Sequence, residues 1–252
     1  MSVARPTAYL LLLVSTGLAA LKAAAQTEFS GTVTVTSDYR FRGLSQDARL
    51  ITPQAELDWN GRDGWSAGLF AAKVDFQDHE NTSLEVDLFG GKHFTIDETD
   101  LALITYYYAY PNHQPGPGSP RYSTIETNAK FSRQWDAIGL SAAIAWSPNF
   151  LANGEAWDVE IGASYTVTPW LTVGGHLGQQ WEERWNRLPG SGFPYGYGDV
   201  GLTANADAWS LDLRYNATTL SSTQCLMAIG GANWCESGFV VSLSYAFGHF
   251  SD

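Results

Sequence analysis

Charged side chains recur at every second position along many segments of this chain. Because successive side chains of a β-strand point to opposite faces, such residues would line one face of a sheet. Rings of charge around an aqueous path sort ions, and acidic rings favour cations. The charged or titratable residues on these faces are Asp38, Arg40, Arg42, Glu56, Asp58, Lys73, Asp75, Glu85, Asp87, Glu126, Lys130, Asp158, Glu160, His176, Asp212 and Arg214. Acids outnumber bases among them, which predicts a weakly cation-selective pore.

The same charges allow two other interpretations. They could pair across neighbouring strands and plug the interior instead of lining an open path. The guanidinium groups of Arg40 and Arg42 could also contact an anionic group of a solute. For these two residues we favour pairing with neighbours, such as Glu56 on the second predicted strand or residues of the last strand.

Catalytic chemistry has little support in the sequence. Nucleophilic catalysis needs a nucleophile beside a base, and the only His-x-Ser spacing is His249-Phe250-Ser251 near the end of the chain. His176 is the one histidine on a predicted inward face, and nothing in the sequence brings Ser141 or Ser164 to it. We therefore predict that the protein is not an enzyme, with a barrel lipase or deacylase as the less favoured alternative.

Metal and cofactor sites are not predicted. No His/Cys spacing of the zinc type occurs, and Asp78, His79 and Glu80 form a run typical of a solvated loop. The two cysteines, Cys225 and Cys235, would form a disulfide in an exported chain. Free thiols are the alternative.

The N-terminus has the pattern of a secretory signal peptide. Arg5 supplies positive charge, an apolar stretch opens at Tyr9, and Ala23-Ala24-Ala25 forms a cleavage site before Gln26. The apolar stretch is shorter than the roughly 20 residues of a membrane-spanning helix. The prediction is a signal peptide over residues 1–25 and a mature chain over residues 26–252.

Composition favours a membrane β-barrel over a soluble β-sandwich. The chain has 10 Trp, 12 Tyr, 12 Phe and 25 Gly, and its net charge is −12. Aromatic and glycine enrichment at modest hydropathy suits a barrel in which only alternate residues face lipid. The negative charge argues against a nucleic acid as partner, because phosphates would be repelled.

Alternation predicts about twelve strands joined by short and long connections in turn. The first, Phe29–Arg42, places Phe29, Val33 and Phe41 on one face. The third shows a change of phase that suggests a bulge near Ala71, and the last ends at Phe247. The registers of Leu101–Tyr110 and Tyr197–Ala204 are left open.

Aromatic residues gather near both predicted ends of the strands. Trp59, Trp170 and Trp209 lie near short connections, whereas Trp146 and Trp181 lie near long ones. Two such belts are typical of the two headgroup levels of a bilayer. The fold class predicted is therefore an all-β, transmembrane, antiparallel up-and-down β-barrel in the bacterial outer membrane, with its apolar faces toward lipid.

Three segments resemble a known family. The segment Thr36–Gln46 (TSDYRFRGLSQ) is similar to the opening motif of the proteobacterial TorF family, also called Gcw_chp, and Glu85–Gly91 and Trp146–Phe150 resemble later blocks of that family. The resemblance implies an outer-membrane barrel that acts as a pore, with no established solute. The residues that follow Phe247 depart from a strict terminal Phe.

The function expected is passive passage of small hydrophilic solutes or ions across the outer membrane. The partners expected are membrane lipids and those solutes. A structural or adhesive barrel without an open pore is the main alternative. No large inserted loop is expected as a constriction, and the oligomeric state is left open.

Overall fold

The protein is a single closed β-barrel. The structure, a computed structural model, describes residues 28–185, 192 and 194–251. Twelve long antiparallel strands pair in sequence order, and β14 closes the ring against β1. They are β1 (Glu28–Thr36), β4 (Thr52–Asn60), β5 (Trp65–Lys73), β6 (Leu84–Ile96), β7 (Thr99–Ala109), β8 (Thr124–Trp135), β9 (Ile138–Ser147), β10 (Ala156–Thr168), β11 (Leu171–Glu182), β12 (Tyr195–Ala206), β13 (Trp209–Thr218) and β14 (Gly238–Ser251).

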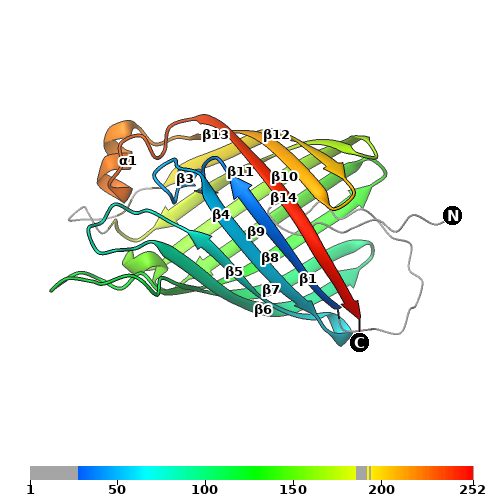
Figure 1. Cartoon of the computed structure of the whole chain (residues 1–252), viewed down its shortest axis with the longest axis horizontal. Helices are drawn as coiled ribbons and strands as arrows, with labels where there is room; N and C mark the ends of the chain where they lie inside the picture. The colour runs from blue at the N-terminus through cyan, green and yellow to red at the C-terminus, as the bar shows by residue number, and fades with distance from the viewer. Residues whose placement is uncertain (1–27, 186–191, 193, 252) are drawn as a thin grey trace.

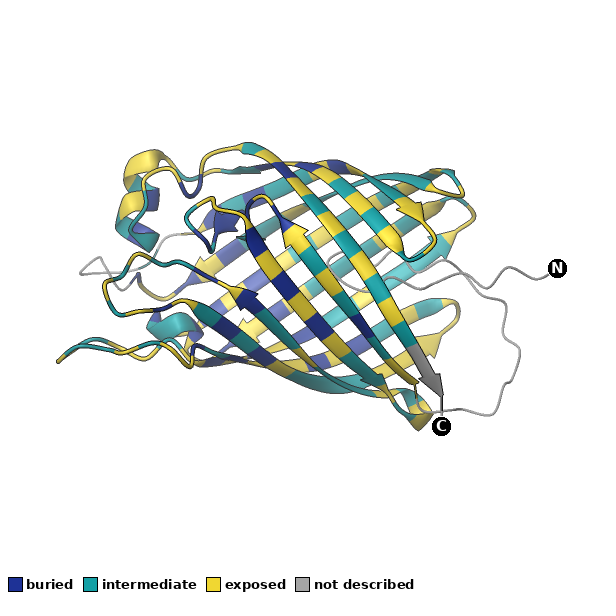
Figure 2. Ribbon diagram, viewed as in Figure 1, coloured by how far each residue is buried: buried dark blue, intermediate teal, exposed yellow. Residues whose placement is uncertain are grey.

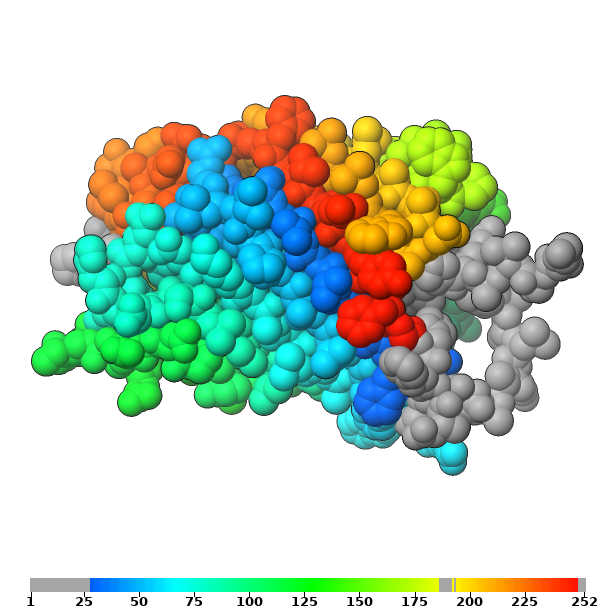
Figure 3. Space-filling model, viewed as in Figure 1, coloured from blue at the N-terminus to red at the C-terminus, as the bar shows by residue number. Residues whose placement is uncertain are grey.

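The barrel is apolar outside and polar inside, which confirms the predicted orientation of the strand faces. Along β1, Val35 is 52% exposed whereas the next residue, Thr36, is 4% exposed. A similar alternation of more and less exposed residues can be followed along many of the strands in Figure 2. Because buried side chains here face the lumen, the large exposed side chains form a continuous lipid-facing band. In the space-filling view, β14 lies against β13 on one side and β1 on the other, so the wall is closed at this seam (Figure 3).

Long and short connections alternate around the barrel as predicted. β1 begins and β14 ends at the end with short turns, and α1 (Ser222–Ile229) lies at the opposite end (Figure 1). We call the end with long loops the outer end and the end with short turns the periplasmic end, as in bacterial barrels. Trp170 and Trp209 are exposed at the periplasmic end, and Trp146 and Trp181 near the outer end.

The remaining elements are short. The strands β2 (Arg40–Phe41) and β3 (Leu44–Ser45) form a separate two-stranded hairpin, and η1 (Arg62–Gly64) and η2 (Phe150–Ala152) are single 3₁₀ turns. The helix α1 begins with a capping box, in which Ser221 and Gln224 satisfy each other's backbone N–H groups. Among the described residues, no helix is both long and apolar enough to cross a bilayer.

Two predicted strand boundaries and one predicted bulge are wrong. The first strand stops at Thr36 rather than Arg42, because the chain turns into the barrel there. The bulge near Ala71 does not exist: the pairing of β5 with β6 is continuous from Trp65 to Lys73. The last strand continues past Phe247 to Ser251.

The absence of that bulge inverts the predicted faces at the end of β5. Ala72 and Val74 point inward and are 2% and 0% exposed, whereas Lys73 is exposed on the outer side of the wall. The two open registers are also resolved. Tyr106 and Tyr108 of β7 and Tyr197 of β12 face the lumen.

Candidate functional site

The lumen is the candidate functional site, because most of the predicted charged residues meet there. The strands place these inward: Glu56, Asp58, Glu85, Asp87, Glu126, Lys130, Asp158, Glu160, His176, Asp212 and Arg214. Asp75 does not belong to this wall. It follows β5 in an outer loop, where its carboxylate accepts a hydrogen bond from the backbone N–H of Gln77 at 3.1 Å.

An inserted hairpin occupies the outer half of the lumen, which the sequence did not predict. The segment Ser37–Gln46, which we call the inner hairpin, leaves β1 and contains β2 and β3. Its turn consists of Arg42 (φ 48°) and Gly43 (φ 79°), both in the left-handed region that a two-residue type I′ hairpin requires. A Cβ on Gly43 would lie 2.6 Å from the side chain of Thr218, so glycine also fits the close approach to the wall.

Asp38, Arg40 and Arg42 are therefore not wall residues of the first strand. Nε of Arg40 lies 2.6 Å from Oδ2 of Asp38, and Ser45 donates its hydroxyl to Oδ1 of Asp38 at 2.7 Å. The prediction that Arg40 and Arg42 pair with carboxylates is correct, but Glu56 is not their partner.

Arg42 ties the tip of the inner hairpin to the far wall. Its guanidinium lies 2.8 Å from Glu126 on β8 and 3.4 Å from Asp158 on β10. These strands flank β9, which is opposite β1 in the order of the barrel. The side chains of Arg42, Glu126 and Asp158 are 9%, 3% and 6% exposed. The inner hairpin thus spans the width of the barrel at this level.

The base of the inner hairpin is held by one buried carboxylate. Asp47 is 0% exposed and accepts hydrogen bonds from the backbone N–H groups of Tyr39 and Arg49 and from the hydroxyl of Thr52. A buried carboxylate is stable when donors surround it in this way. Asp47 therefore fixes the point where the chain returns to the wall at β4.

Aromatic residues of the wall and of the turn η2 pack against the same hairpin. The ring of Tyr39 lies 5.9 Å from that of Phe70 on β5, and the ring of Phe41 lies 6.1 Å from that of Tyr108 on β7. The ring of Phe150 stacks on Phe41 at 6.2 Å. These contacts remove the apolar side of the hairpin from water.

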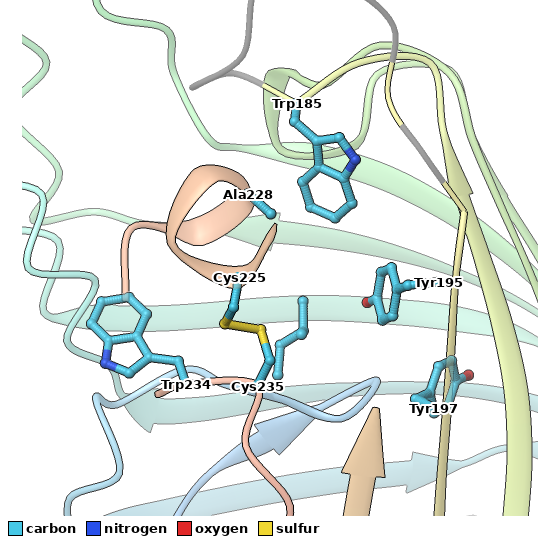
Figure 4. Packing of buried hydrophobic residues seen from close by; sticks show 8 residues of the cluster. Trp185, Tyr195, Tyr197, Cys225, Ala228, Trp234 and Cys235 are labelled. Atoms are coloured by element: carbon cyan, nitrogen blue, oxygen red, sulfur yellow. A yellow bond between two sulfur atoms is a disulfide. The ribbon is translucent and has the colours of Figure 1, made fainter. Parts of the chain in front are cut away.

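The loop that carries the cysteines closes the other side of the hairpin. Cys225 of α1 forms a disulfide with Cys235, as predicted. Around it, Leu44, Trp185, Tyr195, Tyr197 and Trp234 form one buried cluster (Figure 4).

Backbone contacts complete this closure. Arg40 donates to the carbonyls of Trp234 and Glu236, each at 3.1 Å, and the N–H of Ser45 donates to the carbonyl of Trp234 at 3.0 Å. The disulfide loop and the inner hairpin consequently form one body at the outer mouth.

Near the middle of the lumen the charges are linked differently and some are less completely buried. Arg214 of β13 forms ion pairs with Asp199 and with Asp212, the latter at 3.0 Å, and His176 approaches Asp199 at 3.4 Å. Asp58 and Glu160 are only partly buried. Gly139, Ser141 and Ala143 line the inner face of β9 here, and such small side chains leave space between the walls.

Sequence reasoning missed three acids of the interior. Asp199 lies on the same face of β12 as Tyr195 and Tyr197. It was not predicted to face inward because the register of that strand was left open. Glu182 extends the inward face of β11 beyond its predicted end and accepts from the amide of Asn153 at 2.5 Å. Asp47 had no sequence signal, because its role depends on the inner hairpin.

The structure brings Ser141 and His176 together, which the sequence could not do. Both side chains lie over Gly162: a Cβ built there would be 2.5 Å from Oγ of Ser141 and 3.0 Å from Nε2 of His176. Asp199 lies behind His176. However, the backbone N–H groups of these strands belong to the sheet ladder, so they do not form an oxyanion hole. The arrangement is that of a polar cluster in a wet lumen.

The outer loops contain a second group of acids. Asp78, Glu80 and His113 lie close enough to share an ion. Thr82 donates its hydroxyl proton to Asp78, and its oxygen lies 2.8 Å from Nδ1 of His113. Nε2 of His113 lies 3.1 Å from the carbonyl oxygen of Pro120. The group thus joins the loop after β5 to the loop after β7.

Glu80 contributes a fixed charge to this junction. The Ser119 hydroxyl, the Gly116 N–H and the charge of His113 hold the pKa of Glu80 below its usual range. Its carboxylate is therefore ionised wherever the outer membrane faces neutral water.

The fold and the polar interior define the class of the protein, which is that of outer-membrane β-barrels with a porin architecture. Within that class, the chain belongs to the Gcw_chp family, described as bacterial proteins of unknown function, whose model matches residues 20–247. The family description does not include the name TorF, so assignment to a TorF family stays a prediction. No curated protein matches the sequence.

Solved porins have a similar fold at low sequence identity. The structure titled KdgM porin has a TM-score of 0.53 at 8% identity over 87% of this chain and 99% of that one. The NanC porin has 0.55 at 8% identity over 86% and 100%. The COG4313 outer membrane channel from Pseudomonas putida F1 has 0.51 at 10% identity over 93% and 100%.

Proposed function

We propose that the protein is an outer-membrane channel for passive passage of small hydrophilic solutes or ions, with a weak preference for cations. The observation that carries the proposal is a closed, apolar-walled barrel whose interior holds more acids than bases. Acids that line a pore attract cations and repel anions. The porin fold shared with KdgM and NanC supports the same proposal.

The inner hairpin would act as the constriction of this channel. It lies across the outer half of the lumen, and Arg42, Glu126 and Asp158 would set the narrowest charged level. The partly buried acids Glu160, next to that level on β10, and Asp58, near the periplasmic end of β4, would concentrate cations around it. Acyl lipids of the membrane would surround the apolar band.

Planar-bilayer recording tests the proposal. Under a KCl gradient, the refolded protein should give discrete conductance steps and a reversal potential of the sign that marks cation preference. The double variant Asp58→Asn/Glu160→Gln should move that potential toward zero, whereas the exposed turn variant Asp207→Asn should not. A clear anion preference would overturn the proposed selectivity.

A second candidate is a structural barrel without an open pore. The buried contacts of the inner hairpin with the disulfide loop and the wall favour it. The two candidates differ in one result: a correctly folded barrel that never conducts would support the second and contradict the first.

A further inference from the structure

The lipid-facing side of the strands is charged only at basic residues. Lys73 of β5, Lys92 of β6 and Arg133 of β8 point outward, and among the strand side chains that the structure describes no carboxylate does so. This bias is opposite to that of the whole chain, which has 26 acidic and 14 basic residues. A charged side chain that faces lipid is costly unless it reaches the interface or a partner. The outward bases therefore need a counter-charge.

Two of these bases lie near the periplasmic end, on either side of β7. Lys92 is paired with Leu103 of β7, and Arg133 is paired with Thr99 of the same strand. Both β6 and β8 reach their short periplasmic turns shortly after these residues. Long basic side chains at this depth extend to the polar headgroups of the lipid leaflet on that side.

Aromatic rings hold both bases at the headgroup level. Nζ of Lys92 lies 4.9 Å from the centre of the Trp65 ring and 5.6 Å from that of Phe94. The guanidinium carbon of Arg133 lies 4.8 Å from the centre of the Trp135 ring. These three rings are exposed on the lipid side of the wall, where such aromatic residues mark the membrane interface. The cation–π contacts orient the two bases without neutralising their charge.

The protein supplies little negative charge to these two bases. Among the described residues, no ion pair within 4.0 Å includes Lys92. Arg133 lies 3.0 Å from Glu98 of the turn after β6, but the two side chains are 32% and 79% exposed. A pair that is so exposed to solvent contributes little, so an anion from outside the chain can replace Glu98.

We propose that Lys92 and Arg133 form a binding site for anionic phospholipids of the periplasmic leaflet. The guanidinium of Arg133 offers two parallel donors to phosphate oxygens, and Lys92 adds a point charge. The outward side chains of Leu101 and Leu103 on β7 lie between the two bases and would contact the acyl chains. The site is on the outside of the barrel, so it does not depend on the proposed channel.

Native mass spectrometry of the full refolded chain in detergent tests the site. The probes are phosphatidylglycerol and phosphatidylcholine with identical acyl chains, added in equal amounts. Each base near a headgroup favours the anionic lipid about fivefold, so the natural protein should retain phosphatidylglycerol at least about fivefold better. The variant Lys92→Gln/Arg133→Gln should retain both lipids equally. Equal retention by the natural protein, or an unchanged preference in the variant, would overturn the proposal.

A matched control removes two bases from the other end of the barrel. Arg49→Gln/Lys73→Gln makes the same change in net charge at the outer end and should keep the preference for phosphatidylglycerol. Loss of the preference in this control, with the preference kept in Lys92→Gln/Arg133→Gln, would place the lipid at the outer end and contradict the proposal.

Two further measurements do not require removal of a base. Glu98→Gln should increase retention of phosphatidylglycerol, because Arg133 loses its competing carboxylate; unchanged or lower retention would contradict the site. Inorganic phosphate at the concentration of the lipid should not displace phosphatidylglycerol, since it has no acyl chains to contact β7. Displacement would show a site for free phosphate instead of lipid and would also contradict the proposal.

Discussion

Two clusters of ion pairs in the lumen, one at the tip of the inner hairpin and one on β12 and β13, use the same kinds of residue in opposite ways. At the tip of the hairpin, Arg42 bridges two carboxylates that are almost fully buried, and aromatic rings surround it. On β12 and β13, near the middle of the lumen, Arg214 bridges Asp199 and Asp212, whose side chains are 16% and 21% exposed. The difference is the inner hairpin, whose rings exclude water from the first cluster.

This difference suggests a division of roles between the two clusters. Charge that is buried and paired fixes geometry, so the Arg42 cluster would hold the proposed constriction in one place. Charge that is accessible to water acts on passing ions, so the Arg214 cluster would contribute to the proposed selectivity.

The largest effect is expected from loss of Arg42. The substitution Arg42→Gln would leave Glu126 and Asp158 buried without a counter-charge, and removal of one partner of such a pair costs roughly 3–5 kcal/mol. Urea unfolding of the refolded barrel in lipid vesicles measures this change. The matched variant Arg49→Gln breaks an exposed pair with Glu236 and should lose no more than about 1 kcal/mol. Equal losses would contradict the contrast between buried and exposed pairs.

A smaller effect is expected from opening the disulfide. Without the link between Cys225 and Cys235, the outer loop keeps its packing on Leu44 and Trp185 but gains freedom when unfolded. Short loops of this kind contribute on the order of 2–3 kcal/mol. Urea unfolding of the double variant Cys225→Ser/Cys235→Ser and of the reduced natural protein, each compared with the oxidised protein, measures this contribution. If both were as stable as the oxidised protein, the loop would not hold the inner hairpin.

The smallest effect on stability is expected at the cluster on β12 and β13. Arg214→Gln should cost about 1–2 kcal/mol, less than Arg42→Gln, because water reaches Asp199 and Asp212 after the change. The reversal potential of this variant should move toward stronger cation preference, since Asp199 and Asp212 would lose their positive partner. A stability loss as large as that of Arg42→Gln would remove the distinction between the two clusters.

The barrel itself was predictable, because the alternation of residues repeats along strands such as Trp157–Val167 and needs no tertiary information. The inner hairpin was not, since a short hairpin alternates as a strand does: Tyr39 and Phe41 looked like lipid-facing residues that continued β1. Only packing inside the barrel distinguishes the two cases.

One sequence signal for the inner hairpin was present. The segment Leu101–Tyr110 is apolar on both faces, which an open aqueous lumen does not require. In the structure its inward rings, Tyr106, Tyr108 and Tyr110, lie on the inner wall, and Tyr108 contacts Phe41. A strand of a barrel that is apolar on both faces thus indicates that some part of the chain packs inside.

The central claim is that the inner hairpin constricts an otherwise open barrel. A variant in which a short Gly-Ser link replaces residues 39–45, with the disulfide kept, tests this claim. Its single-channel conductance is recorded beside that of the natural protein. We expect small cation-preferring steps from the natural protein and conductance several-fold larger from the shortened one. Unchanged conductance, or no conductance from a shortened barrel that is correctly folded, would contradict the account.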